Sequence, residues 1–485
     1  MSSEPTYDVA IIGAGFSGSM VAVNLLGNQA AVGTVALIEK GGEFGRGVAY
    51  GTSCPRHLLN VPAGKMSAFP DQPDHFLNWL RARAAELEPL GLALADAGTF
   101  VPRMIYGCYI VSLLAEAQTA SGQLKRLSGE AIDVQPLTNG ELRIELSDGE
   151  RLRARKVVLA LGNFPPGNPR LNDRRFHESP RYLNSPWSAS TSEELSGTGD
   201  ILILGSGLTS LDLLLSLEHT KESGTIHVLS RRGLFPQPHQ PVTPYPPFLN
   251  SGSLPRTVRE IFRRVRKEVG KAAAAGSDWR AVIDSLRPLT QELWRGLPIL
   301  ERRRFFRHLR PYWEAHRHRA SRDVLSVKAR LERSGRLRCH RGRVQEIREE
   351  VDGFYVSIGK PPGAEPVTLR VQYVLNCTGP ESNYHNLQDP LVLQLFARGL
   401  IRPDPLFLGL DVAPGGAVLN ARGEQQGNVF TLGSPQKGMI FETTAVPELR
   451  VQAQDLARVL LRDLARTAAK LPDDLQPDPA YTYEI

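Results

Sequence analysis

Two short glycine-rich segments carry the residue types that bind a dinucleotide. In the first, an apolar run ends at a Gly-x-Gly-x-x-Gly pattern, and in the second an apolar run ends at Gly-x-Gly-x-x-Ser. Such a turn directs bare backbone N–H groups and a helix N-terminus toward a pyrophosphate. Two turns therefore predict two bound dinucleotides and electron transfer between them. The glycines are Gly13, Gly15 and Gly18 in the first segment and Gly205 and Gly207 in the second.

The strand that follows each turn indicates which nucleotide binds. In the first unit the run 35–38 ends at Glu39, and an acid at this position binds the ribose of an adenosine. In the second unit the run 225–229 ends at Ser230, Arg231 and Arg232, without an acid. Arginines suit a 2′-phosphate, so NADPH is favoured over NADH. The alternative is that both arginines are only exposed. The residues expected to bind NADPH are Gly205, Ser206, Gly207, Thr209, Ser210, Ser230, Arg231 and Arg232.

Composition limits the class of protein. The 485 residues are 41% apolar and 22% charged, as in a soluble globular protein of two or three domains. No apolar run approaches the roughly 20 residues of a membrane helix. The first strand begins too early to leave room for a signal peptide, so a cytoplasmic location is expected. Four scattered cysteines form no Cys-x-x-Cys, which argues against a redox dithiol and a zinc site.

The net charge of +7 would permit an anionic partner. Most of the excess falls within 256–343, which we interpret as an arginine-rich, solvated helical surface. The segment lacks the interleaved aromatic residues of a single-strand binder, so no nucleic acid partner is expected. His316 and His318 are two residues apart and cannot share a helix face, so no metal site is expected.

The order of elements predicts an α/β fold with two Rossmann-like dinucleotide-binding domains and a helical insertion. Each glycine-rich turn lies between a strand and a helix, and the final strand, 429–432, completes the first domain. The second domain is therefore inserted into the first. The predicted segments are 1–190 and 376–485 for the first domain, 191–253 and 334–375 for the second, and 254–333 for the insertion. The insertion's apolar residues include Leu300, Phe305, Phe306, Leu309, Tyr312 and Trp313.

This order resembles that of two-dinucleotide-domain flavoproteins, in which FAD occupies the N-terminal unit and NADPH the inserted one. The strand ends Ala160-Leu161-Gly162 and Cys377-Thr378-Gly379 match the segments that link those domains. Finer motifs are similar to a bacterial FAD/NAD(P)-binding family that includes FAD-dependent urate hydroxylases and aspartate N-hydroxylases. These motifs are GRGVAY at 45–50, HLLNV at 57–61, PRMIYG at 102–107, SRRG at 230–233 and HRHR at 316–319.

Two departures qualify the resemblance. The stretch 175–187 lacks the Phe-x-Gly-x-x-x-His fingerprint of class B flavin monooxygenases. Ser434 stands where many flavoproteins have an aspartate for the ribityl chain, as in N-hydroxylating monooxygenases. The first departure weakens the case for oxygen activation, and the second is compatible with it.

The resemblance and the pyrophosphate argument together imply a set of site residues. Those expected at FAD are Gly13, Gly15, Phe16, Ser17, Gly18, Glu39, Lys40, Gly45, Arg46, His57, Asn60, Ala131, Gly162, Gly379, Gly433 and Ser434. The residues expected at the reacting centre are Asn60, Lys65, Asn163 and Ser434. Each of the weaker assignments has a structural alternative: a loop brace for Arg46, a hydrogen-bonded turn for His57 and Asn60, an exposed lysine for Lys65, and an Asx cap for Asn163.

The resemblance implies a single-component flavin monooxygenase that uses NADPH and O2. It would C- or N-hydroxylate a small polar, nitrogen-containing substrate through a C4a-hydroperoxyflavin. Two alternatives stay open. One is an NAD(P)H-dependent flavoprotein reductase or dehydrogenase without productive oxygen use, and the other is a non-catalytic flavin-binding redox sensor.

Overall fold

The computed structural model describes residues 4–27, 33–184, 195, 199–218, 224–359 and 366–468. The strands are β1 (Thr6–Ile12), β2 (Val35–Glu39), β3 (Leu124–Ser128), β4 (Ala131–Pro136), β5 (Leu142–Leu146), β6 (Arg151–Leu159), β7 (Tyr182–Leu183), β8 (Ile201–Leu204), β9 (Ile226–Ser230), β10 (Leu337–Arg341), β11 (Arg343–Glu350), β12 (Gly353–Gly359), β13 (Val367–Val371), β14 (Tyr373–Asn376), β15 (Ala417–Leu419) and β16 (Gln425–Thr431). The helices are α1 (Phe16–Leu26), α2 (Gly47–Tyr50), α3 (His75–Ala82), α4 (Ala84–Leu87), α5 (Arg103–Ser121), α7 (Leu208–Leu217), α8 (Val258–Ala274), α9 (Trp279–Ser285), α10 (Thr290–Gly296), α11 (Ile299–His308), α12 (Arg310–Arg317), α13 (Arg322–Arg333), α14 (Pro390–Ala397), α15 (Lys437–Ile440) and α16 (Val446–Ala468).

The first sheet joins the two ends of the chain. Its order is β15-β16-β6-β1-β2-β3, with β5 also paired to β6 and β4 to β5. The strands β16, β6, β1, β2 and β3 run parallel. Their carboxyl ends therefore lie at one edge, where the first glycine-rich turn emerges. The discontinuous α/β arrangement expected from the sequence is confirmed.

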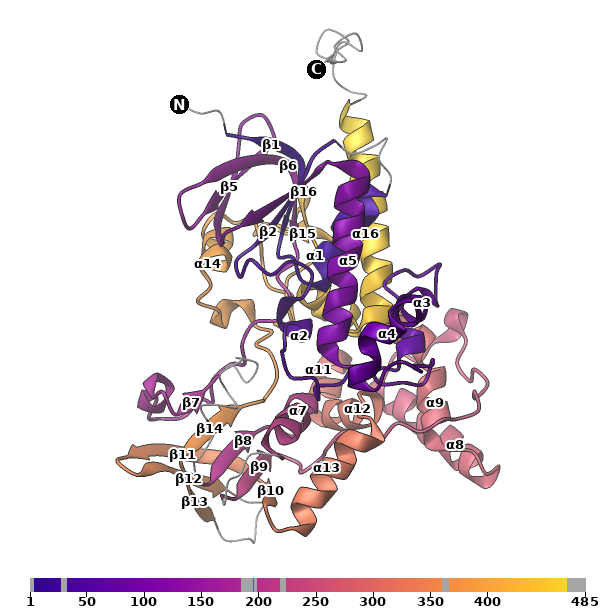
Figure 1. Ribbon diagram of the computed structural model, residues 1–485, viewed down its shortest axis with the longest axis vertical. Helices are drawn as coiled ribbons and strands as arrows, with labels where there is room; N and C mark the ends of the chain where they lie inside the picture. The colour runs from indigo at the N-terminus through magenta and orange to yellow at the C-terminus, as the bar shows by residue number, and fades with distance from the viewer. Residues whose placement is uncertain are drawn as a thin grey trace.

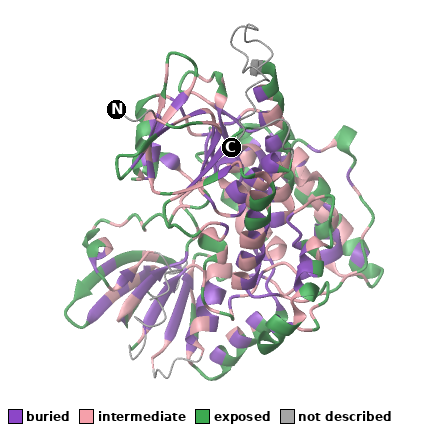
Figure 2. Ribbon diagram, turned by 45° about the horizontal axis from the view of Figure 1, so that its top comes forward, coloured by how far each residue is buried: buried purple, intermediate pink, exposed green. Residues whose placement is uncertain are grey.

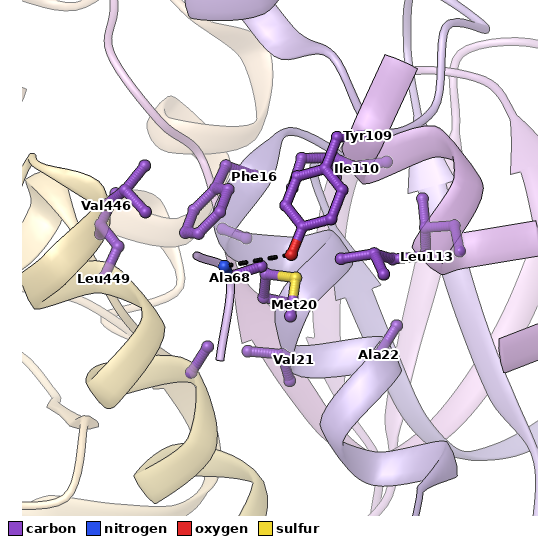
Figure 3. Packing of buried hydrophobic residues seen from close by; sticks show 14 of the residues in the cluster. Phe16, Met20, Val21, Ala22, Ala68, Tyr109, Ile110, Leu113, Val446 and Leu449 are labelled. Carbon is purple, nitrogen blue, oxygen red and sulfur yellow. Dashed lines mark hydrogen bonds between the residues drawn. The ribbon is translucent and has the colours of Figure 1, made fainter. Parts of the chain in front are cut away.

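The two faces of this sheet are covered by different helices, as the alternation of side chains along a strand requires. In β1, Val9 and Ile11 face a core shared with α1, α5 and α16. Figure 1 shows these helices side by side, and Figure 3 shows the packing of their buried residues. Ala10 and Ile12 face the opposite core, which is closed by β4, β5 and α14. In the first core, the Tyr109 hydroxyl accepts a hydrogen bond from the backbone N–H of Ala68 at 3.4 Å (Figure 3).

The second sheet has the order β10-β9-β8-β14-β7, with all strands parallel. Helices α7 and α13 cover one face, and the antiparallel sheet β11-β12-β13 packs on the other. Figure 2 shows that the buried residues lie along the strands and the exposed ones along the outer edges. Because β7 begins at Tyr182, the second sheet starts before residue 190, the boundary expected from the sequence.

The segment 254–333 is helical, as expected. Phe305, Phe306 and Trp294 form an aromatic cluster that encloses Phe441 of the C-terminal segment. Two residues of the predicted apolar group are exposed: Leu300 keeps 62% of its surface accessible to solvent, and Tyr312 keeps 45%. Within the described ranges, none of the helices combines the length and apolar character needed to cross a lipid bilayer.

Candidate dinucleotide-binding and reaction site

The first glycine-rich turn uses its three glycines for different reasons. Gly13 has a φ of +101°, and a Cβ there would overlap the carbonyl oxygen of Ala160. A Cβ at Gly18 would overlap the carbonyl oxygen of Gly13, so these two glycines let the turn pack on the sheet. Gly15 has a φ of −68°, and its nearest neighbour would be the Cα of Gly47 at 3.6 Å. Packing within the turn therefore does not require glycine at position 15.

Glu39 is fixed against this turn. Its carboxylate accepts hydrogen bonds from the N–H groups of Ala14 at 2.8 Å and Gly41 at 3.2 Å. The acid predicted to bind a ribose thus lies beside the turn predicted to bind the pyrophosphate. The neighbouring Lys40 is exposed and lies 3.9 Å from the carboxylate of Glu130.

The segment after β2 folds back over the turn. The N–H of Gly45 donates to the carbonyl of Ala14 at 2.8 Å. Gly45 has a φ of +92° and packs against Val111 of α5. Arg46 is half-buried and lies beside Gly107, which also belongs to α5. The arginine therefore lies close to the turn, as both its phosphate-binding role and its bracing role require.

Two predicted reaction-site residues that are 271 positions apart in the chain meet at this edge of the sheet. The Ser434 hydroxyl donates to the Asn163 side-chain oxygen at 2.6 Å. Asn163 follows β6, and Ser434 follows β16, its neighbour in the sheet. The N–H of Gly433 donates to the side-chain oxygen of Gln452 at 2.9 Å, so this group already has a hydrogen-bond partner within the protein.

Other expected FAD residues have structural partners. Phe16 is buried and stacks on Tyr106, with ring centroids 6.2 Å apart. Ser17 lies beside Gly433, since its hydroxyl is 3.3 Å from the position of a Cβ on that glycine. Ala131 is buried at the start of β4.

The two strand ends that link the domains run side by side. Gly162 and Gly379 both have positive φ, 63° and 92°, and open space where a Cβ would lie. Pro166 and Pro380, a few residues further on, form a β-bridge. The chain thus passes between the domains twice at one place.

Of the remaining expected residues, His57 and Asn60 contact the second domain. The buried His57 ring lies 2.8 Å from the hydroxyls of both Thr52 and Ser216, the latter on α7. The carbonyl of Asn60 is bonded to His239 Nε2 at 3.0 Å. Lys65 ends the 3-10 helix Ala63–Lys65 and is exposed.

The second glycine-rich turn resembles the first in its backbone conformation, but Ser210 stands where the first turn has its third glycine, Gly18. Gly205 has a φ of +107°, and a Cβ there would overlap the carbonyl oxygen of Cys377. Gly207, at the N-terminus of α7, is exposed and has nothing within 4 Å of a Cβ position. The buried Ser210 donates to the carbonyl of Gly207 at 2.7 Å, and Ser206 donates to that of Leu234 at 2.5 Å. Both hydroxyls therefore stabilise the turn, and Gly207 is its open position. The remaining expected residue of this turn, Thr209, is half-buried in the first turn of α7.

The end of β9 is strongly cationic. The Ser230 hydroxyl accepts a hydrogen bond from the N–H of Gly233 at 3.0 Å. Burial lowers the pKa of Arg231, and the positive charges of Arg343, Arg310 and Arg232 lower it further. Such a cluster is stabilised by an anion, as the sequence expectation of a bound 2′-phosphate requires.

A buried ion pair joins the two domains beside His57. Arg103, the first residue of α5, lies 3.0 Å from the carboxylate of Asp212 on α7. Burial raises the pKa of Asp212, while the positive charges of Arg103 and His57 lower it. Sequence reasoning missed Asp212, although an acid within the apolar helix run LDLLLSL signals a buried partner.

The thiol of Cys54 lies at the same junction. Burial raises its pKa, but hydrogen bonding to His57 and the charge of that ring outweigh this, so the pKa falls to about 6. Sequence reasoning used the cysteines only to exclude dithiol and zinc chemistry. In the part of the chain with assigned positions, no three histidine, cysteine or acidic side chains are grouped to hold a metal ion.

Comparisons with known proteins agree with this arrangement. A family model described as FAD-NAD(P)-binding matches residues 10–164. An uncharacterised protein of Mycobacterium tuberculosis is 24% identical over 542 residues, covering 96% of this chain and 98% of the relative. Ornithine hydroxylase from Pseudomonas aeruginosa superposes with a TM-score of 0.66 at 17% identity, covering 95% of this chain and 100% of that one. For L-lysine 6-monooxygenase from Pseudomonas syringae the TM-score is 0.64 at 16% identity, with 94% and 99% covered. The chain thus has the fold of two-dinucleotide-domain flavin monooxygenases, as the resemblance implied.

Proposed function

We propose that this protein is an NADPH-dependent, single-component flavin monooxygenase that hydroxylates a small, nitrogen-containing substrate. The observation that carries the proposal is the meeting of Asn163 and Ser434 at the sheet edge from which the first glycine-rich turn emerges. Polar groups are thereby placed where the reactive end of a dinucleotide held by that turn would lie. The amine-hydroxylating enzymes with this fold support a nitrogenous substrate.

The residues present fit both cofactors. Gly15 and Gly207 are the positions of the two turns where glycine is not needed for internal packing. Bare backbone there serves the close approach of a pyrophosphate to a helix N-terminus. Glu39 beside the first turn suits an adenosine ribose, and Arg231 and Arg232 beside the second suit a 2′-phosphate.

The protein's own groups would bind and orient the reactants. When bound, FAD reduced by NADPH supplies the two electrons with which one atom of O2 enters the substrate and the other leaves as water. Asn163 and Ser434 can exchange hydrogen bonds with polar atoms at the sheet edge. Lys65 would provide a cation for an acidic group of the substrate. Its charge acts on His239, which is bonded to the carbonyl of Asn60. Few general acid–base residues are required, because the cofactor supplies the chemistry of oxygen transfer.

The test uses purified, FAD-loaded protein. Anaerobic NADPH should bleach the flavin, and mixing with oxygen should give a transient near-ultraviolet band before the oxidised spectrum returns. With a substrate panel of amino acids, diamines and purines, oxygen uptake should yield hydroxylated product in place of hydrogen peroxide.

Two results would overturn the proposal. Direct reoxidation with no transient band and no product from any panel member would identify a reductase. Failure of NADPH to bleach the flavin would leave only the non-catalytic sensor.

A further inference from the structure

We propose that α12 of the helical insertion completes the NADPH site, with Arg310 as an additional phosphate-binding cation and Tyr312 as the residue that positions Arg232. This inference rests on the proposed function, because it takes NADPH as the ligand of the second domain. It gives the insertion a binding role that its sequence did not reveal.

The contact between Arg232 and Tyr312 connects the two parts directly. The guanidinium of Arg232 lies over the Tyr312 ring, 5.2 Å from its centroid, and donates to its hydroxyl at 3.3 Å. Tyr312 is nonetheless 45% exposed, so the pair lies at the surface where a nucleotide can reach it. A stacked arginine has lost side-chain freedom before binding, which lowers the entropic cost of holding a phosphate.

The surrounding charges favour an anion. Arg310 and Arg343 are near enough to Arg231 for their charges to act on it, and Arg232 is adjacent. The acid that acts on the same group is Glu314, which pairs with Arg310 at 2.7 Å. With Arg310 paired to Glu314, the three other arginines keep a net positive charge, which exceeds the charge of about −1.5 to −2 that a phosphate carries at neutral pH.

Backbone pairing places these arginines at the correct end of the sheet. The N–H of Gly342 donates to the carbonyl of Ser230 at 3.1 Å, so Arg343 follows directly beside the end of β9. That end is where a nucleotide ribose lies in a dinucleotide-binding fold. Arg310 is the first residue of α12, and its charge acts on Arg231 from the insertion.

The same helix also contacts the segment that follows Ser434. The indole N–H of Trp313 donates to the carboxylate of Glu442 at 2.8 Å. The charges of Arg310 and Glu314 act on Lys437, the first residue of α15. Helix α12 thus lies between the phosphate end of the proposed NADPH site and the edge that carries Ser434.

The experiment measures binding of two fragments to FAD-loaded enzyme by isothermal titration calorimetry. Adenosine 2′,5′-bisphosphate and 5′-AMP differ only in the 2′-phosphate. The Arg310→Ala and Tyr312→Ala variants should each bind the bisphosphate about tenfold more weakly and 5′-AMP nearly as wild type does. Arg310→Lys should recover part of the loss, which separates a charge effect from a folding defect. Arg263→Ala, which removes an exposed arginine on α8, is the matched control and should change neither affinity.

Two different results would contradict NADPH binding and the role of α12. Equal affinity of wild-type enzyme for the two fragments would overturn the NADPH assignment itself. A wild-type preference for the bisphosphate that survives intact in both alanine variants would overturn only the role of α12.

Discussion

The variant Gly207→Ala should separate nucleotide binding from folding in the second glycine-rich turn. Gly207 has a φ of −83° and no atom within 4 Å of the position of a Cβ. Alanine therefore fits the backbone, and the free energy of unfolding should change by no more than about 1 kcal/mol. A pyrophosphate approaching α7 would meet the new methyl group. Loss of one charge-assisted hydrogen bond, about 1.5–3 kcal/mol, would weaken NADPH binding about 10- to 100-fold.

The matched variant is Gly205→Ala in the same turn. Its φ of +107° and the overlap of its Cβ with the carbonyl of Cys377 predict a large loss of stability. The assay is the dissociation constant for NADP+ by calorimetry, together with the melting temperature of the FAD-loaded enzyme. If Gly207→Ala melts with the wild type and also binds NADP+ with wild-type affinity, the turn does not hold the pyrophosphate.

The junction between the domains and the contacts of the insertion can each be tested by modification or substitution of one residue. The rate at which iodoacetamide alkylates Cys54 should rise with a midpoint near pH 6, because the reactive thiolate forms above its pKa of about 6. Cys339, with a pKa of about 11, should stay unreactive at neutral pH. Peptide mass spectrometry after alkylation at pH 5–8 measures both cysteines, and a Cys54 that reacts only above pH 8 would contradict the prediction. Asp212→Ala should lower the free energy of unfolding by about 3–5 kcal/mol, because the buried Arg103 loses its carboxylate partner. Adding Arg103→Met should restore part of the melting temperature, whereas a further, additive loss would contradict the prediction. Phe441→Ala should cost about 3–5 kcal/mol and raise hydrogen exchange in α10, and unchanged exchange would show that the aromatic cluster does not hold the insertion in place.

The sequence predicts the two dinucleotide domains because their signals are local. A strand, a glycine turn and a helix occupy neighbouring positions, and the parallel register of β1 and β2 follows from burying both. Strand β7, which pairs in the second sheet, contains only Tyr182 and Leu183 and lies before residue 190. A strand of two residues has no periodicity to detect, and it forms because β14 offers it backbone partners.

The junction between the domains could not be predicted from sequence. His57 lies in a motif that the resemblance associates with the flavin, yet its ring is bonded to Ser216 of the second domain. Partners so far apart in the chain leave no pattern in one sequence, because they meet only when both domains have folded. The contact of Tyr312, one of the insertion's apolar residues, is likewise not visible in the sequence. Its neighbour across the surface is Arg232, and a cation over the ring favours partial exposure.

The helical insertion also stabilises the segment that follows Ser434. Phe441 has a φ of 56°, a conformation that costs a non-glycine residue about 1–3 kcal/mol. Its ring stacks on Trp294 with centroids 4.7 Å apart, and aromatic pairs of this kind contribute about 0.5–1.5 kcal/mol each. Packing against the insertion thus offsets the backbone strain. Because Trp294 also donates to the carbonyl of Gly438 at 2.9 Å, the insertion contacts the segment after Ser434 through both a hydrogen bond and ring stacking. The insertion therefore links the proposed NADPH contacts of α12 to the geometry of the edge at which the substrate would react.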